Sequence, residues 1–169
     1  HVTRFTAVQR QVHELVTDTL RTMVARIQSG SDNLKDFRSL WESDFVATSN
    51  KMKAIGFREA EAIPWDSIKK ELYGAANYIR VKSINGTSAD VLDYREHEAN
   101  VRQKNQRGEQ VPWNEMGISV IAVGGDKLSR GLTLDGLSIS YYLRASRMYD
   151  TLMQMGRWFG YRDGYTDLC

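Results

Sequence analysis

An almost unbroken apolar run at residues 118–123 constrains the fold more than any other stretch of this chain. A β-strand that is buried on both faces needs such a run, and strands of this kind occur in parallel sheets with helices on either side. Gly124 and Gly125 follow the run, and glycines let the backbone turn sharply and let a neighbouring group approach closely. We therefore expect a central parallel strand that ends at a tight loop.

The residues after this strand predict a loop, a second strand and a helix. Residues 137–143 have the pattern of the second strand, and residues 149–161 have the pattern of the helix. In open α/β sheets, ligands bind beyond the carboxyl ends of the strands. The loop at residues 124–136 is therefore expected to lie where a ligand binds.

The first part of the chain predicts helices. Apolar residues recur at helical spacing over residues 6–27, with a capping-box pattern at Thr6 and Gln9 and a stop signal at Gly30. Residues 31–78 also favour helix, with Pro64 opening the last one.

Two further segments complete the pattern. Alternating β-branched residues predict a strand at 79–84, which ends in an Asn85-Gly86 turn signal. Residues 95–110 are polar and mixed in charge, so they favour a solvated loop or an exposed helix.

Strands that alternate with helices predict an α/β fold with a parallel sheet and right-handed crossovers. A length of 169 residues favours one domain, 1–169, in which residues 31–78 form a helical insertion. Residues 1–5 resemble the end of a strand, and no methionine precedes His1. We therefore expect the chain to be a fragment of a longer protein.

Composition excludes several classes of protein. The 23 Lys and Arg residues nearly balance the 21 Asp and Glu residues, so any basic surface must be local. The one cysteine, Cys169, excludes a disulfide framework and a cysteine metal site. No apolar run approaches the roughly 20 residues of a membrane span, and no signal peptide is present. We expect a cytoplasmic protein without a membrane partner.

The predicted helix at 149–161 carries the residues best suited to phosphate chemistry. Gln154 and Arg157 are three apart and share a face. The guanidinium of arginine is a planar fork of donors that suits phosphate, and an arginine that enters from a neighbouring lobe can stabilise a transferring γ-phosphate. Taken alone, this pattern fits a surface charge at least as well, so both interpretations are open.

Two motifs that follow each other in the expected order are a more specific signal than either motif alone. Ser129-Arg130-Gly131 follows the buried strand, and the Gln154 and Arg157 helix follows the second strand. This order resembles the second RecA-like lobe of superfamily-two helicases and translocases. The resemblance implies a RecA-like three-layer parallel sheet with helices on both faces.

The resemblance also implies roles for individual residues. It implies DNA contacts by Lys127, Ser129 and Arg130, and nucleotide contacts by Gly131 and Thr133. It assigns Gln154, Arg157 and Arg162 to ATP that a first lobe holds. Arg157 matches the superfamily pattern directly. Gln154 and Arg162 are offset from it, and Thr133 stands where many relatives have a ribose-binding Asp.

One branch is more similar still. Residues 124–137, residues 149–162 and the closing Asp-Leu-Cys resemble the Z-one domain family. That family is described as an endonuclease domain and is linked to helicases of prokaryotic restriction and defence systems. Nucleases of the restriction type need an Asp followed by Glu-x-Lys or Asp-x-Lys to hold a metal, and neither tripeptide occurs here. We therefore expect no nuclease site and no metal site, and a nuclease is the third-ranked function.

The resemblance implies the second lobe of an ATP-dependent DNA helicase or translocase, a hydrolase of a restriction system. The chain has no Gly-x-x-x-x-Gly-Lys-Ser/Thr loop and no Asp-Glu pair at a strand end. ATP and Mg would therefore bind only with the first lobe, and this chain alone should be inactive. The alternative is a non-catalytic module with a RecA-like frame that binds nucleic acid or a protein partner.

Overall fold

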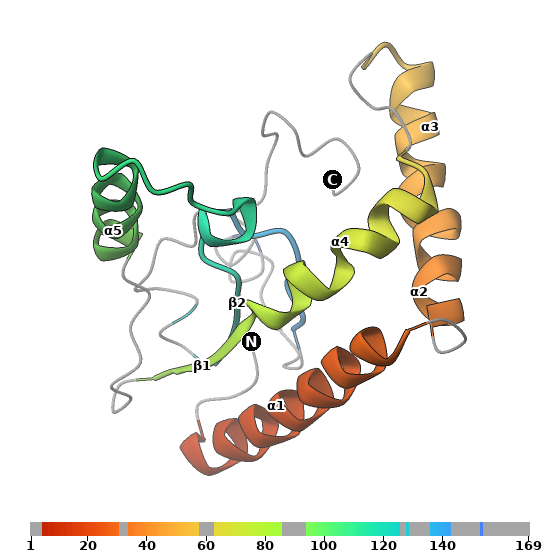
Figure 1. The fold of residues 1–169 in the computed structure, drawn as a ribbon. Helices are drawn as coiled ribbons and strands as arrows, with labels where there is room; N and C mark the ends of the chain where they lie inside the picture. The colour runs from red at the N-terminus through yellow and green to blue at the C-terminus, as the bar shows by residue number, and fades with distance from the viewer. Residues whose placement is uncertain are drawn as a thin grey trace. The chain divides into compact units, whose positions relative to one another are not determined.

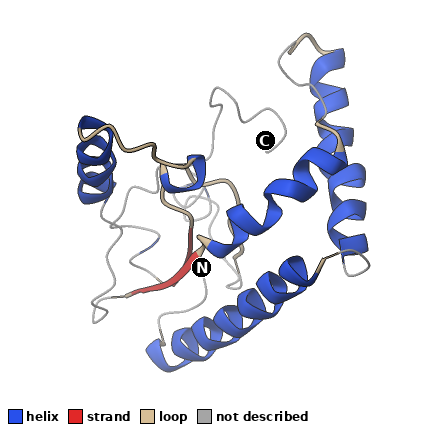
Figure 2. Cartoon of the chain, in the orientation of Figure 1, coloured by secondary structure: helices blue, strands red, loops and turns tan. Residues whose placement is uncertain are grey.

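The structure is a computed structural model of residues 1–169, and it describes residues 5–30, 34–57, 63–85, 94–125, 128, 136–142 and 153. Helices make up most of this part of the chain, and two strands form the sheet (Figures 1 and 2). The chain divides into two compact units, one of which contains both strands. None of the described helices is long and apolar enough to cross a membrane.

The longest helix, α1, spans Thr6–Ser29 and confirms the predicted helix and its stop. Its first backbone hydrogen bond joins Gln9 N to Phe5 O at 3.1 Å. Phe5 therefore stands at the N-cap position, and the capping-box prediction at Thr6 is wrong by one residue. Gly30 has a φ of 75°, a left-handed conformation that glycine adopts at the end of a helix without strain.

The predicted apolar stripe of α1 is shielded only in part. Val8, Leu15 and Met23 belong to that stripe by spacing, yet they are 40%, 67% and 41% exposed. Ile27, at the end of the stripe, is buried as expected, and Gln9, which does not belong to the stripe, is buried too. Spacing identifies the helix, whereas the elements that pack against it decide which side is covered.

Two parallel strands form the sheet. β1 spans Arg80–Ile84 and β2 spans Val120–Gly124, and the register pairs Arg80 with Val120 and Ile84 with Gly124. The predicted strands at 79–84 and 118–123 and their parallel direction are thereby confirmed. The prediction that β2 is buried on both faces is wrong for Ile121, which is 38% exposed, whereas Val123 is buried.

The predicted strand at 137–143 is wrong where the structure describes it. Residues 137–142 have no regular secondary structure. Ile139 and Tyr141 are 73% and 74% exposed, so the apolar side chains that suggested a strand are not shielded here. Within the described residues, the sheet has the two strands β1 and β2.

The segment between the strands is an exposed helix, one of the two alternatives that its polar sequence leaves open. α5 spans Tyr94–Gln106, and none of its residues from 96 to 106 is buried. A 3-10 turn, η3, spans Trp113–Glu115 and leads into β2. Together, β1, α5 and β2 make a parallel strand–helix–strand unit (Figure 1).

The other unit is helical, as residues 31–78 predict. α2 spans Lys35–Leu40, a π-helical segment η2 spans Trp41–Val46, and α3 spans Ala47–Ala54. Trp41 Nε1 donates to Ile63 O at 3.0 Å, and the Trp41 ring stacks on Phe45 with centroids 5.2 Å apart. α4 spans Trp65–Asn77 and follows Pro64 directly, and its first nine residues belong to this unit.

β1 and β2 approach each other closely at their carboxyl ends. A Cβ atom on Gly124 would collide with the Ile84 carbonyl oxygen and would lie 2.8 Å from Leu128 Cδ1. Ile84, Val123 and Leu128 are 2%, 4% and 6% exposed, so they form a small core there. Gly124 is required because this core leaves no room for a side chain.

Replacing Gly124 tests this packing. We expect Gly124→Ala to lower the free energy of unfolding by about 1–3 kcal/mol, because the added methyl group overpacks the core. Denaturant unfolding of the 169-residue chain measures the change. Gly117→Ala is the matched control, since none of the described residues beyond its chain neighbours comes within 4 Å of the place that the added methyl group would occupy. Equal losses of unfolding free energy in the two variants would contradict the close approach of Ile84 to Gly124.

Candidate functional site

All eight residues with predicted roles at ATP or DNA lie outside the described residues. They are Lys127, Ser129, Arg130, Gly131, Thr133, Gln154, Arg157 and Arg162. Two of their neighbours are described: Leu128 is helical and buried, and Met153 is helical and 56% exposed. Leu128 N also donates to Gly125 O at 3.0 Å. Leu128 therefore fixes where the chain leaves β2, at the strand edge where the sequence predicts a ligand.

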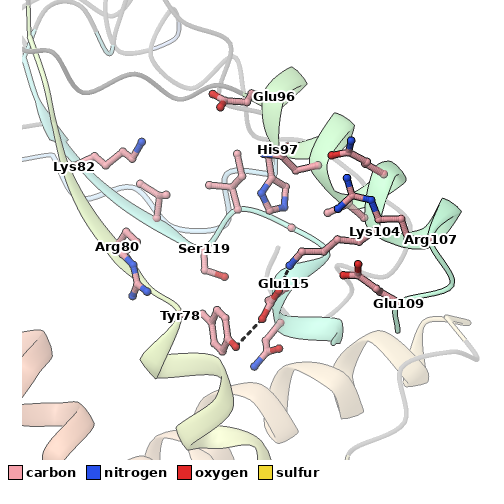
Figure 3. Close-up of a pocket in the computed structure, with 17 residues that line it drawn as sticks. Tyr78, Arg80, Lys82, Glu96, His97, Lys104, Arg107, Glu109, Glu115 and Ser119 are labelled. Carbon is pink, nitrogen blue, oxygen red and sulfur yellow. Dashed lines mark hydrogen bonds and ion pairs between the residues drawn. The ribbon is translucent and has the colours of Figure 1, made fainter. Parts of the chain in front are cut away.

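A cavity of about 910 Å³ lies at the opposite ends of the two strands. Its walls come from the first residues of β1, the residues that lead into β2, α5 and η3 (Figure 3). We call this cavity the polar groove, because most of its lining residues carry a charged or amide side chain. Its basic and acidic residues are Arg80, Lys82, Lys104, Arg107, Glu96, Glu109 and Glu115.

The local structure explains why the basic residues gather there. Arg80 and Lys82 are two apart on a strand, so they share one face of the sheet. Lys104 and Arg107 are three apart at the end of α5, where Arg107 N still donates to Gln103 O. They therefore share one face of that last turn. Each wall of the groove thus receives a pair of cations.

Glu115 is at the centre of a hydrogen-bonded network in the groove. Tyr78 Oη donates to Glu115 Oε1 at 2.8 Å, and Lys104 Nζ donates to Glu115 Oε2 at 2.9 Å (Figure 3). The Lys104 and Glu115 side chains are 45% and 28% exposed. Both carboxylate oxygens are therefore occupied, one of them by a charged donor.

This network shifts the pKa values of its members. The hydrogen bond from Lys104, followed by that from Tyr78, lowers the pKa of the Glu115 carboxyl group. The hydrogen bond to Glu115 raises the pKa of the Lys104 ammonium group and that of the Tyr78 hydroxyl group. Glu115 and Lys104 therefore remain charged, and Tyr78 remains protonated, around neutral pH.

Two other groove residues donate hydrogen bonds to backbone carbonyl groups at the carboxyl end of α4. Arg80 Nη1 donates to Asn77 O at 2.9 Å and to Ile79 O at 3.2 Å. Asn114 Nδ2 donates to Gly74 O at 3.1 Å. Cations and amide donors are favourable at the carbonyl end of a helix, because that end carries unsatisfied acceptors.

Two polar atoms of this wall have no hydrogen-bond partner among the described residues. They are Asn114 Oδ1 and His97 Nε2, and both are buried. A buried polar atom without a partner costs free energy. Because neither atom is exposed, neither is offered to a ligand in this conformation.

The groove is suited to binding. Its central carboxylate is ionised and engaged by two donors, so it is not poised to take up a proton. Within the described ranges, no group of three His, Cys, Asp or Glu residues is arranged to hold a metal ion. Charged and amide side chains along both walls can contact a polar, charged ligand.

Sequence reasoning did not identify Tyr78, Lys104 or Glu115 as site residues. The polar pattern of residues 95–110 predicts only a solvated loop or an exposed helix. The signals were the basic pairs at positions 80 and 82 and at 104 and 107. Their meeting depends on how the crossover folds back, which local spacing does not specify.

Comparisons with known proteins identify one family. A family model described as the Z1 domain matches residues 1–169. The resemblance to the Z-one domain family at residues 124–137 and 149–162 is thereby confirmed. No curated protein and no solved structure matches the chain.

The Glu115 network predicts a dependence of stability on pH. A lowered pKa in the folded state stabilises the fold above the unfolded-state pKa, which is about 4.3 for Glu. This stabilisation is lost as the pH falls through the folded-state value. We expect Glu115→Gln to be less stable than wild type at pH 7 and to lose less stability on acidification.

Thermal unfolding between neutral and acidic pH measures this difference. Glu98→Gln is the matched control, because Glu98 is on α5, is mostly exposed and lies 3.8 Å from Arg102. If Glu115→Gln and wild type lose the same stability on acidification, the network does not stabilise the fold.

Proposed function

Since the chain belongs to the Z1 domain family, we propose that it is the second RecA-like lobe of an ATP-dependent DNA helicase or translocase. The proposal places that motor in a prokaryotic restriction or defence system. It includes a RecA-like three-layer sheet, of which the parallel pair β1 and β2 would be two neighbouring strands. The parallel direction and the helical crossover between them support this fold.

The order of two motifs after β2 carries the proposal. Ser129-Arg130-Gly131 follows the buried Leu128, and Gln154 and Arg157 follow further along the chain. Leu128 packs at the carboxyl end of β2, where α/β proteins bind their ligands. A basic motif that begins at this edge is suited to a phosphate-bearing ligand.

In this proposal, each residue has a distinct role. Lys127, Ser129 and Arg130 contact the DNA backbone, for which cations and hydroxyl donors are suited. Gly131 and Thr133 lie at the nucleotide.

At the ATP itself, Arg157 stabilises charge on the γ-phosphate, with Gln154 and Arg162 beside it. The chain has no phosphate-binding loop, so ATP and Mg belong to the first lobe.

The absence of that loop also favours a second candidate function. Without a phosphate loop and an Asp-Glu pair, the chain could act as a module that binds nucleic acid or a protein partner without catalysis. A protein in which this chain is joined to a phosphate-binding lobe would favour the motor.

Arg157 provides the test of the motor. In the protein that joins this chain to a first lobe, we expect Arg157→Ala to reduce DNA-stimulated ATP hydrolysis by at least ~10³-fold, because the γ-phosphate loses its arginine. Circular dichroism should show an unchanged fold. Arg21→Ala, at an exposed arginine of α1, is the control and should retain activity. Unchanged DNA-stimulated ATP hydrolysis by the Arg157→Ala variant would refute the proposed role of Arg157 at the γ-phosphate.

Arg130 tests the DNA contact separately. We expect Arg130→Ala to weaken DNA binding and to lower the salt dependence of the binding constant by about one counterion. Fluorescence anisotropy at several salt concentrations measures both quantities. If DNA affinity and the DNA concentration for half-maximal ATPase are both unchanged, Arg130 does not contact DNA.

A further inference from the structure

We propose that the polar groove binds single-stranded nucleic acid, as a second contact surface at the amino ends of β1 and β2. Leu128 packs at the carboxyl ends of the same strands, so the groove lies at the other ends of the pair from Leu128. The choice of DNA as the polymer rests on the proposed function. The groove itself is argued from its own side chains.

Cations face the groove from both walls. Arg80 and Lys82 come from β1, Lys104 comes from the last turn of α5, and Arg107 directly follows that helix (Figure 3). A strand of phosphates between these walls would meet positive charge on either side. Such grooves follow the backbone of single strands in proteins that bind them without sequence preference.

The charge of Arg107 is available to a ligand. Lys104 is neutralised by Glu115, and Arg80 is bonded to backbone carbonyl groups. The exposed side chain of Arg107 has no hydrogen bond or ion pair with the described residues. Since it also lines the groove, Arg107 is the cation that would contact a phosphate most directly.

The shape and polarity of the groove favour a chain-like ligand. The α5 wall runs from Glu96 to Arg107, a length of about 16 Å at roughly 1.5 Å per helical residue. Pockets for compact ligands are mostly lined by apolar and aromatic side chains, whereas most of the residues that line this groove carry a charged or amide side chain. A backbone with repeated charges matches an extended polar surface better.

The same walls distinguish nucleic acid from an acidic peptide. Amino groups of unpaired bases can donate hydrogen bonds to Glu96 and Glu109, whereas the carboxylates of such a peptide have no donor to offer them. Tyr78 lines the groove. Aromatic rings of this kind can stack on bases.

Anisotropy of a labelled, mixed-sequence single strand of ~15 nucleotides tests the groove in the full chain. Removing one phosphate contact should lower the salt slope by about 0.7, which corresponds to roughly fourfold weaker binding at 0.15 M salt. We expect this loss for Arg107→Ala. The matched control is Arg102→Ala, on the same helix, with a side chain that is 78% exposed and does not line the groove.

Three results would overturn the proposal. They are the absence of binding by wild type, equal affinities for the Arg107→Ala and Arg102→Ala variants, and displacement of the strand by a poly-glutamate peptide as readily as by unlabelled strand.

Arg130→Ala in the same assay separates the groove from the DNA contact of the proposed function. A loss with Arg130→Ala alone would refute the groove and leave the proposed function standing, whereas a loss with Arg107→Ala alone would support the groove and count against the DNA contact of Arg130.

Discussion

The close contact between the Ile84 carbonyl group and Gly124 is the constraint on which the described sheet depends. In a parallel pair, one register fixes both ends at once. The pairing of Ile84 with Gly124 brings the chain out of β2 over a small buried core. The pairing of Arg80 with Val120 sets the other end beside α5 and η3. The buried core at Gly124 and the polar groove are thus set at the two ends of the pair by one alignment.

Local sequence patterns predicted the elements that local interactions determine. Apolar spacing identified α1, alternation identified β1, and a polar composition identified α5 as exposed. The patterns failed where shielding by distant residues decides the outcome. They placed Leu15 and Ile121 on covered faces, and they predicted a strand that includes Ile139; all three side chains are exposed. Apolar character favours burial but cannot supply the neighbour that provides it.

The two sets of candidate residues come from different kinds of information. Arg130 and Arg157 were found from motifs, since their chemistry and order are written in the sequence. The Tyr78, Lys104 and Glu115 network was found only in the structure, because its members are 37 and 11 residues apart. No local pattern links residues at those separations. The family match extends over the whole chain and so includes both sets.

The polar crossover also bears on how the unit moves. Most crossover helices pack an apolar stripe against their sheet, but no residue of α5 from 96 to 106 is buried. Its backbone amides should therefore exchange with solvent through local opening, at a lower free energy than those of Ile84 and Val123. A ligand held between α5 and β1 would slow that exchange. α5 would then open locally more often in the free protein than in the protein with a bound ligand.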